Sequence, residues 1–306
     1  MTKEGKQGAR YKVLIKVCVM TLSLALSGIS HSKALLLVNW NMNNLTHPST
    51  ESSSRTTQEI KILAAASKKM GADIIAMQEV GGARTALDVF GPDYKYYMSG
   101  KDERGLRVGF AVSDRLDVSK SYIYTPLAND GGRLGVDITV GSARGAEIRI
   151  LNVHLAEGCE QEQLPSTRSS DCERISQQAV ALAKWVSYRK KEGVPFMIMG
   201  TLSRYIGEEQ IDRKPGLLSE LNKSYEKFGD ELNKPVDGLK TLSGDKRPGC
   251  WDYRRPDFVD HFLVDPSMRK MVVESSFREA GFGSSWSRAK ERKFSDHCPI
   301  KVMVRI

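Results

Sequence analysis

Short apolar runs, separated by helical patterns, are the feature that most constrains the fold of this 306-residue chain. Several runs are apolar at nearly every position, which is typical of strands covered on both faces in a sheet with helices outside it. The predicted strands are Leu35–Trp40, Ile74–Met77, Lys95–Met98, Arg107–Val112, Ile148–Val153, Phe196–Met199, Val259–Val264 and Ile300–Val304.

Two longer stretches have the spacing of amphipathic helices. In Thr57–Met70 the apolar residues recur every three or four positions, and a cluster of Ser and Thr precedes it to supply an N-cap. Cys172–Arg189 has a similar apolar stripe. Because no repeat or low-complexity linker divides the chain, we predict one α/β or α+β domain. The composition, 40% apolar and 27% charged, excludes a disordered, collagen-like or multi-span membrane protein.

Much of the formal charge of +9 lies in residues 1–34, which carry six basic residues and one acidic residue. A 13-residue apolar run, Val17–Ile29, follows the basic segment, and small residues follow the run. This layout predicts a signal peptide over residues 1–34 and a mature domain over residues 35–306 that is secreted or periplasmic. The run is short of the roughly 20 residues that a spanning helix needs, so we expect no stable membrane insertion of the mature chain. An uncleaved N-terminal anchor is the alternative.

Four cysteines remain after Cys18 is removed with the signal peptide. An even number in an exported chain favours two disulfides, of which three pairings are open. Cys159 and Cys172 bracket one polar loop, so a local bridge is the simplest pairing, and Cys250 would then pair with Cys298. Four free thiols or a metal site are the alternatives, although no CxxC spacing is present.

Polar residues gather where the predicted strands end. Asn41 follows the first strand, Glu79 follows the second, and His154 follows the strand at Ile148–Val153. Asp260 interrupts an apolar strand, and the run Ser-Asp-His-Cys-Pro-Ile, which contains His297, precedes the last strand. Polar side chains at strand ends are typical of a site on the rim of a sheet.

In this order the motifs resemble the endonuclease/exonuclease/phosphatase superfamily, which includes deoxyribonucleases, apurinic endonucleases, sphingomyelinases and inositol-phosphate phosphatases. The resemblance runs from Leu35 to Ile306, and the Ser-Asp-His-Cys-Pro-Ile run is its most specific part. It implies a four-layer sandwich of two packed mixed β-sheets flanked by helices. It also implies metal-assisted cleavage of a phosphodiester or phosphomonoester.

The resemblance also implies roles for single residues. His297, oriented by Asp260, would contact the scissile phosphate, and His154 would contact it from the opposite side. A carboxylate behind an imidazole favours the cation, which stabilises charge on phosphoryl oxygens. His261 would face away from the site because adjacent strand residues alternate, which favours a structural histidine. The metal ligands, for Mg²⁺ or Mn²⁺, would be Asn41, Glu79 and Asp296.

One motif departs from the family. Its strand ends Gly-Asp-x-Asn, often followed by Arg, whereas this chain has Gly200-Thr201-Leu202-Ser203-Arg204. Thr201 and Ser203 thus stand where the water-activating Asp and its Asn partner belong, and a hydroxyl is not a base at neutral pH. The chain is therefore a natural pseudoenzyme, or uses another base such as Glu208 or Glu209, or has a deliberately altered site.

Basic residues interleaved with aromatics flank the last motif and favour a nucleic-acid ligand. Solvated loops are the alternative, because the mature chain has 40 basic and 36 acidic residues. The predicted substrate contacts are Arg204, Arg254, Arg255, Arg292 and Lys293. We therefore expect an exported, monomeric phosphodiesterase-family protein, a nuclease being favoured, with impaired activity. The alternatives are a non-catalytic binder of nucleic acid or a phosphorylated ligand, and a phospholipid or inositol-phosphate phosphodiesterase.

Overall fold

The computed structural model describes residues 34–48, 55–128, 133–141, 146–226, 237–249, 257–280, 295–297 and 299–306, all within one compact unit, Ser32–Ile306. The predicted signal peptide lies outside these residues except for Ala34. Six residues of the predicted disulfide and substrate contacts also lie outside them: Cys250, Arg254, Arg255, Arg292, Lys293 and Cys298.

The described strands form two six-stranded mixed sheets. The first has the order β11-β12-β1-β2-β4-β3, and the second β5-β6-β7-β8-β10-β9. Within them β1 runs parallel to β2 and β7 runs parallel to β8, whereas the other pairs are antiparallel. The first sheet contains β1 (Ala34–Leu45), β2 (Ile74–Val80), β3 (Tyr94–Met98), β4 (Arg107–Ser113), β11 (Arg278–Glu279) and β12 (Ile300–Arg305). The second contains β5 (Asp117–Tyr124), β6 (Gly135–Gly141), β7 (Glu147–His154), β8 (Phe196–Thr201), β9 (Lys240–Thr241) and β10 (Asp260–Val264).

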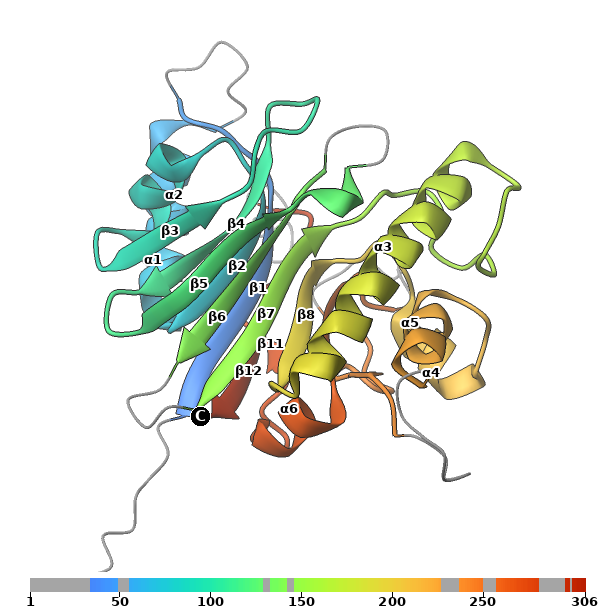
Figure 1. Cartoon of the computed structure of the whole chain (residues 1–306). Coiled ribbons are helices and arrows are strands. Elements are labelled where there is room, and N and C mark those ends of the chain that lie inside the picture. The colour runs from blue at the N-terminus through green and yellow to red at the C-terminus, as the bar shows by residue number, and fades with distance from the viewer. Residues whose placement is uncertain are drawn as a thin grey trace, which may run out of the picture. The chain divides into compact units, whose positions relative to one another are not determined.

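Helices cover the outer faces of both sheets (Figure 1). α1 (Thr57–Met70) and α2 (Ala83–Phe90) pack on the first sheet, whereas α3 (Ser170–Glu192) and α5 (Leu217–Glu226) pack on the second. Three shorter helices, η1 (Thr125–Leu127), α4 (Ile206–Asp212) and α6 (Pro266–Met271), connect the strands. The predicted four-layer α+β sandwich is confirmed.

Burial on both faces explains the continuous apolar runs. In β8, Met197 and Met199 face the other sheet, whereas Phe196 and Ile198 face α3 and α5. Alternate residues of a strand point to opposite faces, so a strand between two apolar layers needs apolar residues at every position.

Local signals place the first helix as predicted. Thr56 caps α1: its hydroxyl accepts from the Glu59 backbone N–H, and the Glu59 carboxylate accepts from the Thr56 N–H. This capping box satisfies two of the helix's free N–H groups. Gly71, at φ +61°, ends the helix in the left-handed conformation that glycine adopts without steric cost.

All eight predicted runs coincide with strands, apart from Val259, which precedes β10; β5, β6 and the two-residue strands β9 and β11 were not predicted. β5 is an edge strand whose side chains are mostly exposed, including Tyr122 and Ile123, so it has no apolar run to detect. β6 is buried but contains Asp137, whose carboxylate accepts two hydrogen bonds from Arg149 on the next strand. A buried ion pair interrupts the apolar pattern while the sheet continues.

The local disulfide between Cys159 and Cys172 is confirmed. It ties the loop after β7 to the first turn of α3. The Cys250–Cys298 bridge stays a prediction. Within the described residues, no helix is both long enough and apolar enough to cross a membrane.

Candidate active site

The strand register brings the predicted site residues together. In the first sheet Asn41 pairs with Gln78, the residue before Glu79, across the parallel strands β1 and β2. In the second sheet Thr201 lies between His154 on β7 and Asp260 on β10. Parallel strands end at the same edge of a sheet, and the Asn41–Thr201 hydrogen bond joins the two sheets there, so these polar residues meet at one rim of the sandwich.

Asp260 and His297 form the pair that the motifs predicted. His297 Nδ1 lies 2.7 Å from Asp260 Oδ2, and Asp260 is buried. Burial opposes ionisation of this carboxyl, but the His297 charge and the hydrogen bonds from His297 and Thr201 outweigh it and lower the Asp260 pKa. Asp260 can therefore remain ionised and hold the imidazole in one orientation.

Asn41 connects this pair to the first sheet. The Ser295 hydroxyl donates to the Asn41 backbone carbonyl at 2.7 Å and accepts from the His297 N–H at 2.9 Å. The Asn41 side-chain oxygen accepts from the Asn43 N–H, so its amide nitrogen faces the site and donates to Thr201 Oγ1 at 3.1 Å. Asn41 thus offers a hydrogen-bond donor to the site.

Glu79 sits at the end of β2 with φ +58°, in the left-handed region that is costly for a residue with a Cβ. Backbone strain of this kind clusters at functional sites. Its Oε2 accepts from the Asn44 N–H at 3.0 Å, and its Oε1 lies 3.3 Å from Arg104 Nη2 and 3.7 Å from His154 Nε2. Burial opposes ionisation, but the charges of His154 and Arg104 lower the Glu79 pKa.

Thr201 occupies the centre of the site as a neutral bridge. Its hydroxyl donates to Asp260 Oδ1 at 2.7 Å and accepts from the Asn41 amide. Ser203 has φ +51°, is buried, and directs its hydroxyl toward the Leu155 carbonyl at 3.5 Å. Both residues are therefore part of the rim, and neither brings a carboxylate to it.

His154 lies on the opposite side of the site from His297, next to Glu79 and Glu157. Burial lowers the His154 pKa. Its Nε2 is 3.4 Å from Glu157 Oε1, but without hydrogen-bond geometry, and has no hydrogen-bond partner within the described residues. The contact with His154 and the charge of Arg133 hold the pKa of Glu157 well below its usual range.

The predicted set of metal ligands comes together only in part. Asn41 contacts Glu79 through its amide nitrogen, which cannot ligate a cation. Asp296 is more than half exposed and lies 3.8 Å from His297 Nε2. Among the described residues, the one group of three acidic or histidine side chains with converging ligand atoms is Glu79, His154 and Glu157. Of the three predicted oxygen ligands, only Glu79 belongs to it, so these residues fit an all-oxygen Mg²⁺ site poorly.

The predicted role of Arg204 in substrate binding is not what its contacts indicate. Arg204 is 1% exposed, and its Nε and Nη2 donate to Glu209 Oε1 at 2.9 and 2.7 Å. The remaining donors bond the Cys159 and Glu162 carbonyls. A guanidinium with all these partners is a structural tie between α4 and the disulfide loop.

The other residues that sequence reasoning raised are also bonded elsewhere. Glu208 lies within ion-pair distance of Lys214 and Arg247. His261 bonds the Thr241 hydroxyl and the Arg204 carbonyl, which agrees with a structural histidine.

Sequence reasoning missed Arg104 and Glu157, which approach the site from loops. Glu157 stands three residues after His154, and that proximity was the one available signal. It also missed a buried amide network in which Gln78 donates to Asn39 within the first sheet at 2.8 Å and to Asn152 in the second sheet at 2.7 Å. The bond from Gln78 to Asn152 helps to fix the relative placement of the two sheets.

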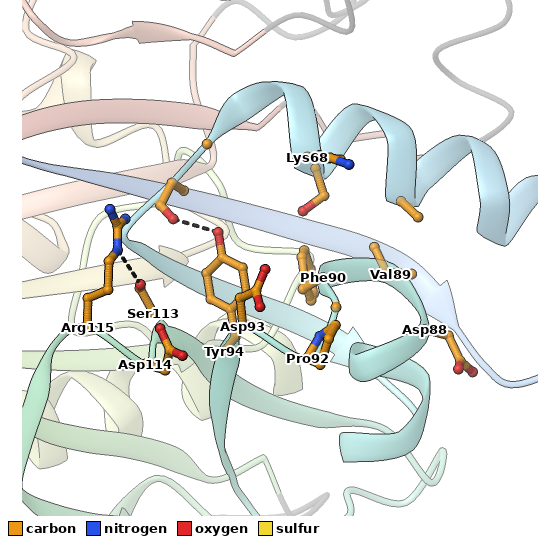
Figure 2. A pocket seen from close by; sticks show the side chains of 15 residues that line it. Lys68, Asp88, Val89, Phe90, Pro92, Asp93, Tyr94, Ser113, Asp114 and Arg115 are labelled. Carbon is orange, nitrogen blue, oxygen red and sulfur yellow. Dashed lines mark hydrogen bonds between the residues drawn. The ribbon is translucent and has the colours of Figure 1, made fainter.

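Depressions lie near both ends of β3 and β4. One opens beside Glu157 and is lined also by Arg104, Arg133, Arg174 and Gln178, among others. The other lies at the start of β2 and β3, near the C-terminal end of α1, where Tyr94 donates to the Ala72 carbonyl and Arg115 bonds Ser113 (Figure 2). None of the predicted site residues lines either depression, whereas Glu79 and His154 line a much smaller cavity together with Arg133.

Comparison with known proteins identifies the fold. No family model matches the sequence, and no curated protein matches it. Among solved structures, truncated TDP2 of Caenorhabditis elegans is 20% identical, with 89% of this chain and 98% of that chain covered and a TM-score of 0.56. TDP2 of D. rerio, complexed with a single-strand DNA product, is 14% identical, with 90% and 100% covered and a TM-score of 0.60. An endonuclease/exonuclease/phosphatase family protein of Bacteroides thetaiotaomicron is 15% identical, with 89% and 95% covered and a TM-score of 0.54. The chain therefore has the fold of the endonuclease/exonuclease/phosphatase superfamily.

Proposed function

We propose that this chain is an exported protein of the phosphodiesterase type, with nucleic acid as the favoured ligand and with impaired hydrolysis. The observation that carries the proposal is the place of Thr201: its hydroxyl bridges Asp260 and Asn41 where a water-activating carboxylate would be needed. Around it His297, which the resemblance assigns to phosphate binding, is kept beside Asp260.

The retained residues support binding of a phosphate ester. His297, held by Asp260, can donate a hydrogen bond to a phosphoryl oxygen, and its protonated form would stabilise the negative charge there. Asn41 directs its amide N–H groups into the same site. These contacts need no proton transfer, so they persist when a general base is missing.

The missing base accounts for the impairment. Loss of a general base costs about 10²- to 10⁴-fold in rate, or roughly 3 to 5 kcal/mol of barrier. Glu208 and Glu209, the carboxylates nearest in sequence, are engaged with Lys214, Arg247 and Arg204. Their contacts argue against either one acting as a displaced base.

The substrate class is supported by two observations. TDP2 of D. rerio, a neighbour in fold, was solved with a single-strand DNA product. The predicted basic contacts Arg254, Arg255, Arg292 and Lys293 lie close in sequence to the Asp260 and His297 motifs. A phospholipid or inositol-phosphate substrate, or binding without turnover, is the alternative.

The decisive experiment compares the wild-type chain, residues 35–306, with Thr201→Asp/Ser203→Asn. We expect the double variant to cleave single-stranded DNA, RNA or a generic phosphodiester at least about 10²-fold faster. Asn suits position 203 because it tolerates the positive φ there. Thr201→Asn/Ser203→Asn is the matched control, with the same shape at position 201 but no base.

Each outcome is informative. Equal rates in the wild type and the Asp variant would show that Thr201 is not the defect. Equal rates in the Asp and Asn variants would show that no base acts from position 201. If the wild type and all variants fail to bind any of these ligands, the phosphodiester proposal is wrong. Export is tested separately, by N-terminal sequencing of the secreted or periplasmic protein.

A further inference from the structure

We propose that Glu79, His154 and Glu157 form a binding site for a divalent transition-metal ion of the Zn²⁺ or Co²⁺ class, with the imidazole as one ligand. The ion would lie on the His154 side of the rim, away from Asp296. Binding of the ion stands independently of the proposed function, whereas its use in hydrolysis rests on it.

The spacing of the three side chains fits a single small ion. Their ligand atoms lie within 4.8 Å of one another, with His154 Nε2 at 3.7 Å from Glu79 Oε1 and 3.4 Å from Glu157 Oε1. Bonds of about 2.1 Å at a tetrahedral angle place neighbouring ligand atoms about 3.4 Å apart. The group therefore needs only small side-chain shifts to close on an ion.

His154 gives an independent reason to expect a ligand. It is 3% exposed, and its Nε2 is buried without a hydrogen-bond partner among the described residues, although it faces both carboxylates. A buried polar atom left unsatisfied costs about 1 to 3 kcal/mol. Coordination would satisfy this nitrogen, which an all-protein arrangement leaves unpaired.

The donor set selects the kind of ion. An imidazole beside two carboxylates suits Zn²⁺ and its substitute Co²⁺, whereas Mg²⁺ and Mn²⁺ prefer all-oxygen sites, and Mg²⁺ retains several waters. Three protein ligands leave a fourth position open, which is typical of catalytic zinc sites. An ion of this kind supplies an activated water when bound, which is the capacity that Thr201 lacks.

Two arginines contact the carboxylates of this group and would compete with the ion for them. Arg104 contacts Glu79, and Arg133 contacts Glu157 at 3.1 Å. The Arg104 side chain is 47% exposed and can turn toward solvent, whereas Arg133 is only 20% exposed and also bonds the Leu155 carbonyl. Removing Arg104 should therefore tighten metal binding by leaving Glu79 free.

The test uses the chelator-treated chain 35–306 and titrations with Co²⁺, followed by visible absorption, and with Zn²⁺ and Mg²⁺, followed by calorimetry. We expect one Co²⁺ ion per chain, with a visible spectrum typical of four- or five-coordination. Zn²⁺ should displace this ion, whereas the same concentration of Mg²⁺ should not. Glu157→Gln should weaken Zn²⁺ binding at least about tenfold, in line with the loss of one anionic ligand. Arg104→Gln should strengthen it.

Glu157 is the primary position because its side chain is 58% exposed, so Glu157→Gln should fold, and a melting curve checks this. Asp296→Asn is the matched control, since Asp296 belongs to the predicted all-oxygen site but not to this group. Loss of Zn²⁺ binding in Asp296→Asn and not in Glu157→Gln would overturn the proposal, as would an octahedral Co²⁺ spectrum.

Failure of the proposed function is distinguishable from failure of the site. Stoichiometric Zn²⁺ binding that needs Glu157, without any phosphodiester binding, would leave the site standing and refute the function. Phosphodiester binding or cleavage without Zn²⁺ or Co²⁺ binding would do the reverse.

Discussion

The buried ion pair of Arg204 and Glu209 should be sensitive to the change of a single atom. In Glu209→Gln an oxygen becomes an amide nitrogen while the volume is kept. Glu209 Oε1 accepts from two Arg204 nitrogens, and its Oε2 accepts from the Leu218 N–H at 2.9 Å. A glutamine has one carbonyl oxygen, so either the guanidinium or the Leu218 N–H loses its acceptor.

The magnitude follows from burial. The side chains of Arg204 and Glu209 are 1% and 5% exposed, so the uncompensated charge of Arg204 cannot be solvated. Breaking a buried pair by removing one partner costs about 3 to 5 kcal/mol. The carbonyls of Cys159 and Glu162 still accept from Arg204, which favours the lower end of that range.

Urea denaturation of chain 35–306, followed by circular dichroism, measures the effect. Glu208→Gln is the matched control, because the neighbouring Glu208 has only longer contacts, at 3.9 and 3.5 Å, to largely exposed Lys214 and Arg247. We expect the control to lose less than about 1 kcal/mol. Equal unfolding free energies for the two variants would refute the structural role assigned to Arg204.

Three other expectations follow from the described contacts. Cys159→Ala/Cys172→Ala should lower the free energy of unfolding by about 3 kcal/mol, on the chain-entropy estimate for a loop with a sequence separation of 13; an unchanged urea midpoint would contradict it. Burial raises the pKa of Tyr124 to about 12, so its contribution to the free energy of unfolding is complete below pH about 10 and is lost as the pH rises toward 12. Tyr124→Phe should remove this contribution to the loss of stability at alkaline pH. Urea midpoints at several alkaline pH values measure the effect. The Asp260 pKa is lowered, so this carboxylate contributes to the free energy of unfolding above the unfolded pKa near 3.8, and the contribution is lost at lower pH. Asp260→Asn should therefore make the free energy of unfolding less dependent on pH in the acid range. An unchanged acid dependence would argue against the pair with His297.

The buried strands and the polar rim could be predicted from the sequence because both depend on local patterns, whereas the four-layer sandwich was implied by the family resemblance of the motifs. A strand buried on two faces has to be apolar throughout, so β1, β2, β7 and β8 were visible as runs. A polar residue at the end of an apolar run interrupts the pattern, and this interruption predicts Glu79 and His154 as site residues. The Cys159–Cys172 bridge was predictable for the same reason, since both cysteines border one loop.

Tertiary structure alone decided which polar side chains meet and which atoms they present. Arg104 reaches Glu79 from a loop 25 residues away in sequence, and Arg204 turns into the core although its neighbour Ser203 lies on the rim. Asn41 directs its nitrogen, and not its oxygen, into the site because the Asn43 N–H takes the oxygen. The direction of a side chain depends on every group packed around it, including groups distant in sequence. Contacts between distant residues produce no periodic pattern in the sequence. The sequence could therefore predict the place of the site but not its set of ligands.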